Sequence, residues 1–292
     1  MMLSESIIAY LRHAELVKGY SQNTVLNYEH HLRKFFEWSG DLPIKRITLE
    51  LVLDYKKYLI GNGIKLSSIG EKIKVLRLLL QYLNEQGKHC LDPHKLPRGQ
   101  AAGQRITFLT REEFIRLTSV VNIATLEGKR NRAILETFFA TGARLEELVK
   151  LNRQDVKLEE GEAVVIGKGE KVGTLYFNDR AKKYLAEYLA ERTDNFSALF
   201  SYVRKHNNQS SGRIGKRTVW AIVKRYMCAA GLPNDMTVHS LRHSFATHLI
   251  KSGVNIKAVQ ELMRHSSLAS TEIYLHYVNV EVKELHRKAM DF

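Results

Sequence analysis

Three stretches of the sequence place cationic side chains and a tyrosine at spacings that suit phosphate chemistry. Arg144 lies in TGARLEEL, His239 and Arg242 share one helical face in HSLRH, and His265 precedes Tyr274 by nine residues in RHSSLASTEIY. Guanidinium groups donate paired hydrogen bonds to phosphate oxygens, and a tyrosine becomes a nucleophile when neighbouring cations favour its phenolate. These residue types therefore indicate a site that binds a phosphate ester and attacks it.

Two of these motifs also have an ordinary structural interpretation when each is taken alone. Arg144 and Glu147 are spaced for a surface ion pair, and Tyr274 is one of 13 tyrosines, most of which must serve packing. Glu147 is an acidic residue beside a predicted cationic site, and we expect it to orient Arg144 rather than to bind a metal.

The histidines of HSLRHSFATHL raise the alternative of a zinc site, because two histidines at i,i+4 can share one ion. However, HSLRH lacks the glutamate of the HExxH motif, and Arg242 would repel the cation. We therefore predict no metal site, with His243 and His248 serving helix packing or facing solvent.

The composition indicates a globular protein with a polyanionic partner. Of 292 residues, 44% are hydrophobic and 26% charged, and the formal net charge is +14, which favours nucleic acid binding. Cys90 and Cys228 are not spaced for a disulfide framework or a cysteine zinc site, which fits a reducing compartment. Neither an export signal nor a run of about 18 apolar residues is present, so we expect a cytoplasmic protein without a membrane span.

The chain divides into a helical first part and a mixed second part. Apolar residues recur at helical spacing over residues 4–18, 22–38, 48–60 and 67–86, and a stretch rich in glycine and proline follows. We predict a helical domain over 1–95, a linker over 96–108 and a second domain over 109–292.

The second domain is predicted to hold a small sheet among helices. Thr110 and Glu113 form a capping-box pattern, a helix over 133–140 ends at Thr141-Gly142, and another begins near Arg144. Short strands are expected at 156–158, 163–166 and 174–177, the last two joined by a hairpin, and helices at 179–191, 216–230, 238–251, 255–263, 270–276 and 280–290.

Taken in order, the motifs resemble the active site of the tyrosine recombinases, in particular the Xer-type and phage-integrase branch. The SxNTxxxYxxxLxxF run from Ser21 to Phe35 also resembles the start of the family's helical core-binding, SAM-like domain, so the resemblance covers most of the chain. The six matching positions are Arg144, Lys168 in GKGEK, His239, Arg242, His265 and Tyr274.

The chain departs from the family's pattern at two places. Arg264 stands before His265, where the family often has glycine. Val172-Gly173-Thr174-Leu175 follows the predicted hairpin turn, where an arginine followed by Val-Pro is common. Lys171 lies on the same turn as Lys168, and we assign the catalytic lysine to Lys168 because GKG matches the motif best.

The resemblance implies a DNA strand-exchange enzyme that needs neither metal nor ATP. Tyr274 would form a 3′-phosphotyrosyl link, Arg144 and Arg242 would hold the phosphate, and Lys168 would protonate the departing 5′ oxygen. His265 would donate a further hydrogen bond to the phosphate, and His239 would assist proton transfer. The implied fold is mainly α with a small β-sheet, in which a helical core-binding domain and an α/β catalytic domain clamp duplex DNA.

The expected partner is double-stranded DNA, bound by a homotetramer on two sites and by a monomer or dimer in free solution, with a paralogous recombinase or accessory protein as a further partner. The residues after Tyr274 would contact a neighbouring protomer or pack on their own domain. A type IB topoisomerase, a non-catalytic DNA-binding regulator and a metal nuclease are the alternative functions. The basic residues that we consider for DNA contact, or else for an ordinary solvated face, are Lys72, Lys74, Arg77, Arg213, Lys216 and Arg217.

Overall fold

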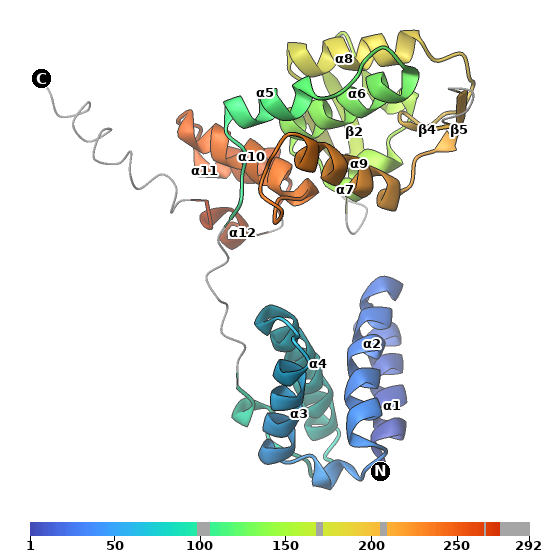
Figure 1. Ribbon diagram of the computed structural model, residues 1–292. Coiled ribbons are helices and arrows are strands. Elements are labelled where there is room, and N and C mark those ends of the chain that lie inside the picture. Colours follow the sequence, from blue (N-terminus) through green and yellow to red (C-terminus); the bar gives the residue numbers. More distant parts are fainter. Residues whose placement is uncertain (98–105, 168–171, 205–208, 266, 275–292) are drawn as a thin grey trace, which may run out of the picture. The chain divides into compact units, whose positions relative to one another are not determined.

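The computed structural model describes residues 1–97, 106–167, 172–204, 209–265 and 267–274. The chain forms two compact units, Met1–Arg105 and Ile106–Phe292 (Figure 1). Within the described ranges, no helix is long and apolar enough to cross a membrane.

Four helices make the first unit, as the apolar periodicity predicts. In α4 the residues at three- and four-residue intervals, among them Ile69, Ile73, Leu76 and Leu83, are all buried. They pack with Leu32 and Phe35 of α2, Val52 and Tyr55 of α3, and Leu3 and Ile7 of α1. The Thr48 side chain caps α3 by accepting from the Leu51 N–H at 3.2 Å. The bounds are α1 Leu3–Leu16, α2 Gln22–Ser39, α3 Leu49–Gly61 and α4 Leu66–Glu85.

The second unit combines eight described helices with two small antiparallel sheets. One sheet has the order β1-β2-β3, and the other is the β4-β5 hairpin. The predicted capping box is present, because Thr110 and Glu113 exchange hydrogen bonds of 2.9 and 3.2 Å. The helices are α5 Arg111–Ser119, α6 Leu126–Thr141, α7 Leu145–Lys150, α8 Asp179–Ala190, α9 Lys216–Ala229, α10 Val238–Lys251, α11 Ile256–Leu262 and α12 Ala269–Glu272. The strands are β1 Val156–Lys157, β2 Glu162–Ile166, β3 Val172–Tyr176, β4 Ser201–Arg204 and β5 Gln209–Arg213.

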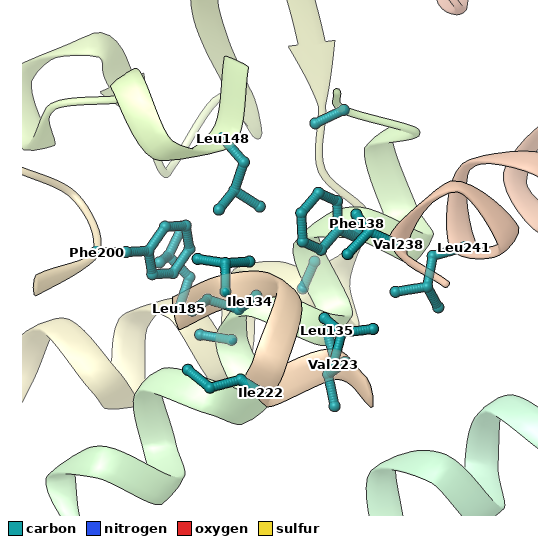
Figure 2. Close-up of a cluster of buried hydrophobic side chains, with 14 of the residues drawn as sticks. Ile134, Leu135, Phe138, Leu148, Leu185, Phe200, Ile222, Val223, Val238 and Leu241 are labelled. Atoms are coloured by element: carbon teal, nitrogen blue, oxygen red, sulfur yellow. The ribbon is translucent and has the colours of Figure 1, made fainter. Parts of the chain in front are cut away.

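Helix α6 is the centre of this unit. It is buried on nearly all sides, and Figure 2 shows its Ile134, Leu135 and Phe138 among side chains of the surrounding elements. Burying each such side chain contributes roughly 1.5–3 kcal/mol. The neighbours labelled in Figure 2 are Leu148 of α7, Leu185 of α8, Phe200, Ile222 and Val223 of α9, and Val238 and Leu241 of α10. The core therefore fixes α7 and α10, which carry the predicted arginines.

The mainly helical fold with a small sheet is confirmed, with one element that the sequence pattern did not predict. The β4-β5 hairpin pairs Val203 with Ser210 and Arg204 with Gln209. Its second strand reads QSSGR, which shows no alternation of apolar and polar residues. The expected segment over 280–290 lies outside the described residues.

Candidate active site

Gly142 sets the direction in which the chain leaves α6 toward the site. It takes the left-handed conformation, with φ 58°, and its N–H donates to the Phe138 carbonyl, which ends the helix. A Cβ at this position would lie 2.4 Å from Cδ1 of Phe245, so the turn packs directly against α10. The chain then enters α7 with Arg144 at its N-cap.

Arg144 is held by two acceptors on the protein side of its guanidinium group. Its Nη1 donates to Glu147 Oε1 at 2.6 Å, and its Nη2 donates to the Arg264 carbonyl at 2.7 Å. The Glu147 side chain is 4% exposed and also accepts from the Arg144 backbone N–H and from Arg264 Nη2. Glu147 therefore holds both the guanidinium group and the backbone N–H of Arg144, through a carboxylate that is buried rather than at the surface.

Arg242 is buried between the end of α6 and the end of α11. Its Nη1 donates to the Gly142 carbonyl and its Nη2 to the Met263 carbonyl. A guanidinium group has five N–H donors, so Arg144 and Arg242 each keep further donors for a ligand. The arrangement holds two arginines in fixed orientation without using up their hydrogen-bonding capacity.

The charges at this site are strongly coupled. Burial, followed by the positive charges of Arg144 and Arg264, lowers the pKa of Arg242 to about 9. Burial alone would raise the pKa of Glu147, but the nearby Arg264 and Arg144 outweigh it and lower that pKa below its ordinary value. Three arginines therefore share one buried carboxylate, and a bound anion would relieve their mutual repulsion.

The two predicted histidines lie beside the arginines. Burial and the charges of Arg242, Arg144 and Arg264 lower the pKa of His265 to about 4, so its ring is neutral at neutral pH. Its Nδ1 lies 2.9 Å from the Thr271 hydroxyl, which fixes the ring orientation. Partial burial of the ring and the Arg242 charge also lower the pKa of His239, although this residue as a whole is exposed.

Tyr274 is withdrawn into a small apolar cluster and is bound by a histidine. It is 2% exposed, among Ala246, Ile250, Val259 and Met263. Burial raises the pKa of its phenol to about 12, against the opposing effect of the Arg242 charge. In this structure the phenol therefore keeps its proton.

The partner of the Tyr274 hydroxyl is His243 Nδ1, at 2.7 Å. Burial, His239 and Arg242 lower the pKa of His243 to about 4, so its ring is neutral at neutral pH, and the tautomer of the ring decides which of the two groups donates in this hydrogen bond. The sequence offered only helix packing or solvent exposure for His243. One feature of the sequence could have revealed the hydrogen bond between His243 and Tyr274: His243 directly follows Arg242, a residue already assigned to the same site as Tyr274. By contrast, His248 Nε2 lies 2.9 Å from the Leu109 carbonyl, which is an ordinary packing contact.

The structure brings five of the six predicted catalytic residues to one region. The sixth, Lys168, and the alternative Lys171 lie outside the described residues. Three other described residues form hydrogen bonds within this region: Glu147 with Arg144, His243 with Tyr274, and Arg264 with Glu147. Only Glu147 was assigned from the sequence.

The basic residues considered for DNA contact in the first unit differ in their surroundings. Arg77 Nη2 donates to the carbonyls of Leu96 and Pro97, at 3.3 and 2.9 Å, so it serves the local fold. Lys74 is exposed and lies 3.5 Å from Glu71, whereas Lys72 is half-buried, with Nζ 3.4 Å from His31 Nδ1.

The three candidates in the second unit differ in the same way. Arg213 donates to the carbonyls of Val149 and Leu151, at 2.6 and 2.9 Å, and thereby ties β5 to the end of α7. Lys216 lies 3.6 Å from Glu146, and Arg217 is exposed at the start of α9. Arg217 and Lys216 thus remain accessible, while Arg213 is engaged with the backbone.

Comparison with known proteins places both units in one family. Residues 107–280 match the phage integrase family, and residues 7–87 match the phage integrase N-terminal SAM-like domain. The chain is 34% identical over 283 residues to the tyrosine recombinase XerA of Thermococcus kodakarensis, covering 94% of this chain and 91% of the relative. It is 28% identical over 281 residues to the tyrosine recombinase XerD of Staphylococcus epidermidis, covering 95% of each.

Among solved structures, the fold is similar to that of the Tn1549 transposon integrase in complex with transposon right end DNA. The TM-score is 0.80 at 18% identity, and the match covers 100% of both chains.

Proposed function

Because the chain belongs to the phage integrase family, we propose that it is a Xer-type site-specific DNA recombinase with Tyr274 as its nucleophile. The observation that carries the assignment of the site is the position of Arg242. Arg242 donates to the carbonyls of Gly142 and Met263, which stand two residues before Arg144 and two before His265, and its charge also affects the pKa of Tyr274.

The reaction follows from that arrangement. The Tyr274 oxygen attacks a DNA phosphorus and gives up its phenol proton, a transfer that His239 assists. Arg144 and Arg242 donate hydrogen bonds to the nonbridging oxygens, on which negative charge grows. The bond from phosphorus to the 5′ oxygen breaks, leaving a 3′-phosphotyrosyl link and a 5′ hydroxyl. Lys168 supplies the proton to that oxygen, and His265 donates a further hydrogen bond to the phosphate.

The religation step needs no energy source. One phosphodiester is exchanged for another, so a 5′ hydroxyl from a partner strand can attack the phosphotyrosyl link and reverse the chemistry. Cations from side chains do the work that metal ions do in nucleases with clustered carboxylates. Two such exchanges join two DNA sites through a Holliday junction.

The partner is duplex DNA in the cytoplasm, and each of the two units contributes to binding it. Four copies of the protein assemble on two DNA sites. The Tn1549 integrase is in complex with DNA in its solved structure, which supports DNA as the partner of this chain as well. The basic charge of +14 supplies nonspecific affinity for phosphates, and groove contacts supply the choice of sequence.

Covalent capture from a random pool of DNA tests the proposal and identifies the target site in the same experiment. The protein is incubated in EDTA with nicked duplexes that carry a randomised segment, and protein–DNA adducts are isolated under denaturing conditions and sequenced. We expect adducts on a defined sequence, lost in Tyr274→Phe and kept in the control Tyr277→Phe, which changes the next tyrosine in the sequence. Adduct formation by Tyr274→Phe at the parent level would contradict the assignment of the nucleophile.

The captured sequence then separates the alternatives. Junctions between two labelled sites are expected from a recombinase, whereas relaxation of supercoiled DNA without junctions would indicate a type IB topoisomerase. Tight binding without any adduct would indicate a non-catalytic regulator. Cleavage that EDTA abolishes would indicate a metal nuclease.

A further inference from the structure

Arg264 has a backbone conformation that suits glycine. Its φ is 53°, and within the described ranges it is the one non-glycine residue with a positive φ. A residue with a Cβ is strained there, and such strain persists when the surrounding structure fixes it. Arg264 keeps this conformation although it has a side chain, and the contacts of that side chain give the reason.

The Arg264 side chain connects three elements. Its Nη2 donates to Glu147 Oε2 of α7 at 3.0 Å, and its Nη1 donates to the Thr174 carbonyl of β3 at 3.3 Å and to the Leu262 carbonyl at 2.7 Å. The side chain is 13% exposed. With these protein acceptors around it, the guanidinium group is placed to hold the site together rather than to contact DNA.

The strand β3 is shaped to receive this side chain. Gly173 lies under Arg264, and a Cβ on Gly173 would come within 2.6 Å of Arg264 Cδ. Gly173 pairs with Val165 in the regular register of β2 and β3, so its missing side chain serves this contact rather than a turn. In the sequence, β3 begins four residues after Lys168.

Arg264 also controls Arg144 by two routes. Its carbonyl accepts from Arg144 Nη2 at 2.7 Å, and its guanidinium group holds the same Glu147 carboxylate that binds Arg144 Nη1. His265 is the next residue in the chain. The position of Arg144 relative to His265 and to β3 therefore depends on Arg264 through both its carbonyl and its side chain.

We infer that Arg264 is a positioning residue for DNA cleavage, one that aligns Arg144 and His265 and anchors β3 beside them. The inference rests on the proposed function, because it assigns Arg264 to the same reaction. It makes this chain dependent on an arginine where glycine is common in similar recombinases.

The first test replaces Arg264 by glycine, which removes the side chain and relieves the backbone strain. We expect Arg264→Gly to stay folded at the assay temperature, because relief of the backbone strain offsets part of the lost ion pair with Glu147, and to bind the captured DNA site within about twofold of the parent. Its single-turnover rate of adduct formation should fall by about 10- to 100-fold, since misplacing a catalytic group by about 1 Å has an effect of this size. Arg264→Lys, which keeps the charge but not the fork of donors, should recover part of the rate.

The second test leaves Arg264 in place and changes Gly173, the residue against which its side chain packs. Gly173→Ala should displace the arginine and lower the cleavage rate in the parent by about fivefold or more, an effect of the same misalignment. In the Arg264→Gly background the added methyl group meets no arginine, so Gly173→Ala should change the rate by less than about twofold. This dependence of one substitution on the other is not expected of two independent structural residues.

The outcomes distinguish the inference from the proposed function. Parent-like cleavage by Arg264→Gly, or an equal effect of Gly173→Ala in both backgrounds, would overturn the role of Arg264 while Tyr274-dependent adducts still formed. A fall in rate that only follows loss of folded protein at the assay temperature or weaker DNA binding would overturn it too. If the parent itself forms no Tyr274-dependent adduct, the proposed function fails, and this inference fails with it.

Discussion

Replacement of Gly142 by alanine tests whether the turn between α6 and α7 is as tightly determined as its geometry indicates. The residue has φ 58°, and its Cβ would lie 2.4 Å from Phe245 Cδ1 and 3.0 Å from Cε1. Its carbonyl accepts a hydrogen bond from Arg242. One methyl group should therefore disturb both the fold and the position of Arg242.

The magnitude has two parts. The left-handed conformation costs an L-residue about 1–2 kcal/mol, and overpacking a filled interior costs typically about 1–3 kcal/mol. The free energy of unfolding should fall by about 2–5 kcal/mol in total. For a unit of this size, about 1 kcal/mol corresponds to roughly 2–4 °C, so the melting temperature should fall by roughly 4–20 °C.

Gly231→Ala is the matched control in the same unit. Its φ is 64°, but a Cβ there would meet no atom within 4 Å. This variant should lose only the conformational part, about 1–2 kcal/mol. Calorimetry of both variants, with single-turnover adduct formation alongside, measures the two effects. Equal losses of stability in the two variants, or a normal rate in Gly142→Ala, would refute the reasoning.

Three further predictions concern charge. Glu136→Gln should lower the free energy of unfolding of the second unit by about 3–5 kcal/mol, because Arg132 and Arg180 lose the carboxylate of a side chain that is 2% exposed. The control Glu160→Gln, at an exposed ion pair, should cost less than about 1 kcal/mol. Denaturant titration measures both, and similar losses in the two variants would contradict the prediction. The free energy of unfolding should fall as the pH drops from about 6.5 to about 4, because in this range His243 and His265 become protonated in the unfolded chain but stay neutral in the folded protein, where burial lowers their pKa. The melting temperature measured against pH should therefore depend less on pH when both histidines are replaced by glutamine. An unchanged pH dependence in that variant would show that the two histidines do not cause it. Arg217→Ala should weaken DNA binding and reduce the slope of the logarithm of the binding constant against the logarithm of the salt concentration by about 1, because Arg217 is exposed and able to contact a phosphate. An unchanged slope in a salt titration would show that this arginine contacts no phosphate.

Much of the fold could be predicted because it follows from local patterns. The four helices of the first unit and the capping box at Thr110 follow from apolar spacing and side-chain oxygens that the sequence shows directly. The β4-β5 hairpin could not be found in this way. Its strand Gln209–Arg213 is short and polar, and it depends on tertiary contacts such as the hydrogen bonds from Arg213 to the carbonyls at the end of α7.

The site could be predicted as a set of residues, but not as a network. Motif resemblance selects Arg144 and Tyr274, while the partners of these groups depend on contacts between distant segments. The bond between His243 and the Tyr274 hydroxyl spans 31 residues, and that between Arg264 and Glu147 spans 117. Neither separation leaves a periodic signal, because these residues meet only when the segment from α11 to Tyr274 packs against α7 and α10.

The two successive carbonyls of Met263 and Arg264, each bound by a different arginine, link scaffold and chemistry in this enzyme. Truncating Arg242 would withdraw a cation and also free the peptide that leads to His265, so the measured loss would exceed the electrostatic effect of the guanidinium group alone. The losses of cleavage rate in the Arg144 variant and the Arg242 variant, expressed as free energies, would then sum to more than the loss in the variant that lacks both arginines. A substitution at either arginine therefore changes the backbone that carries His265 as well as the charge of the site.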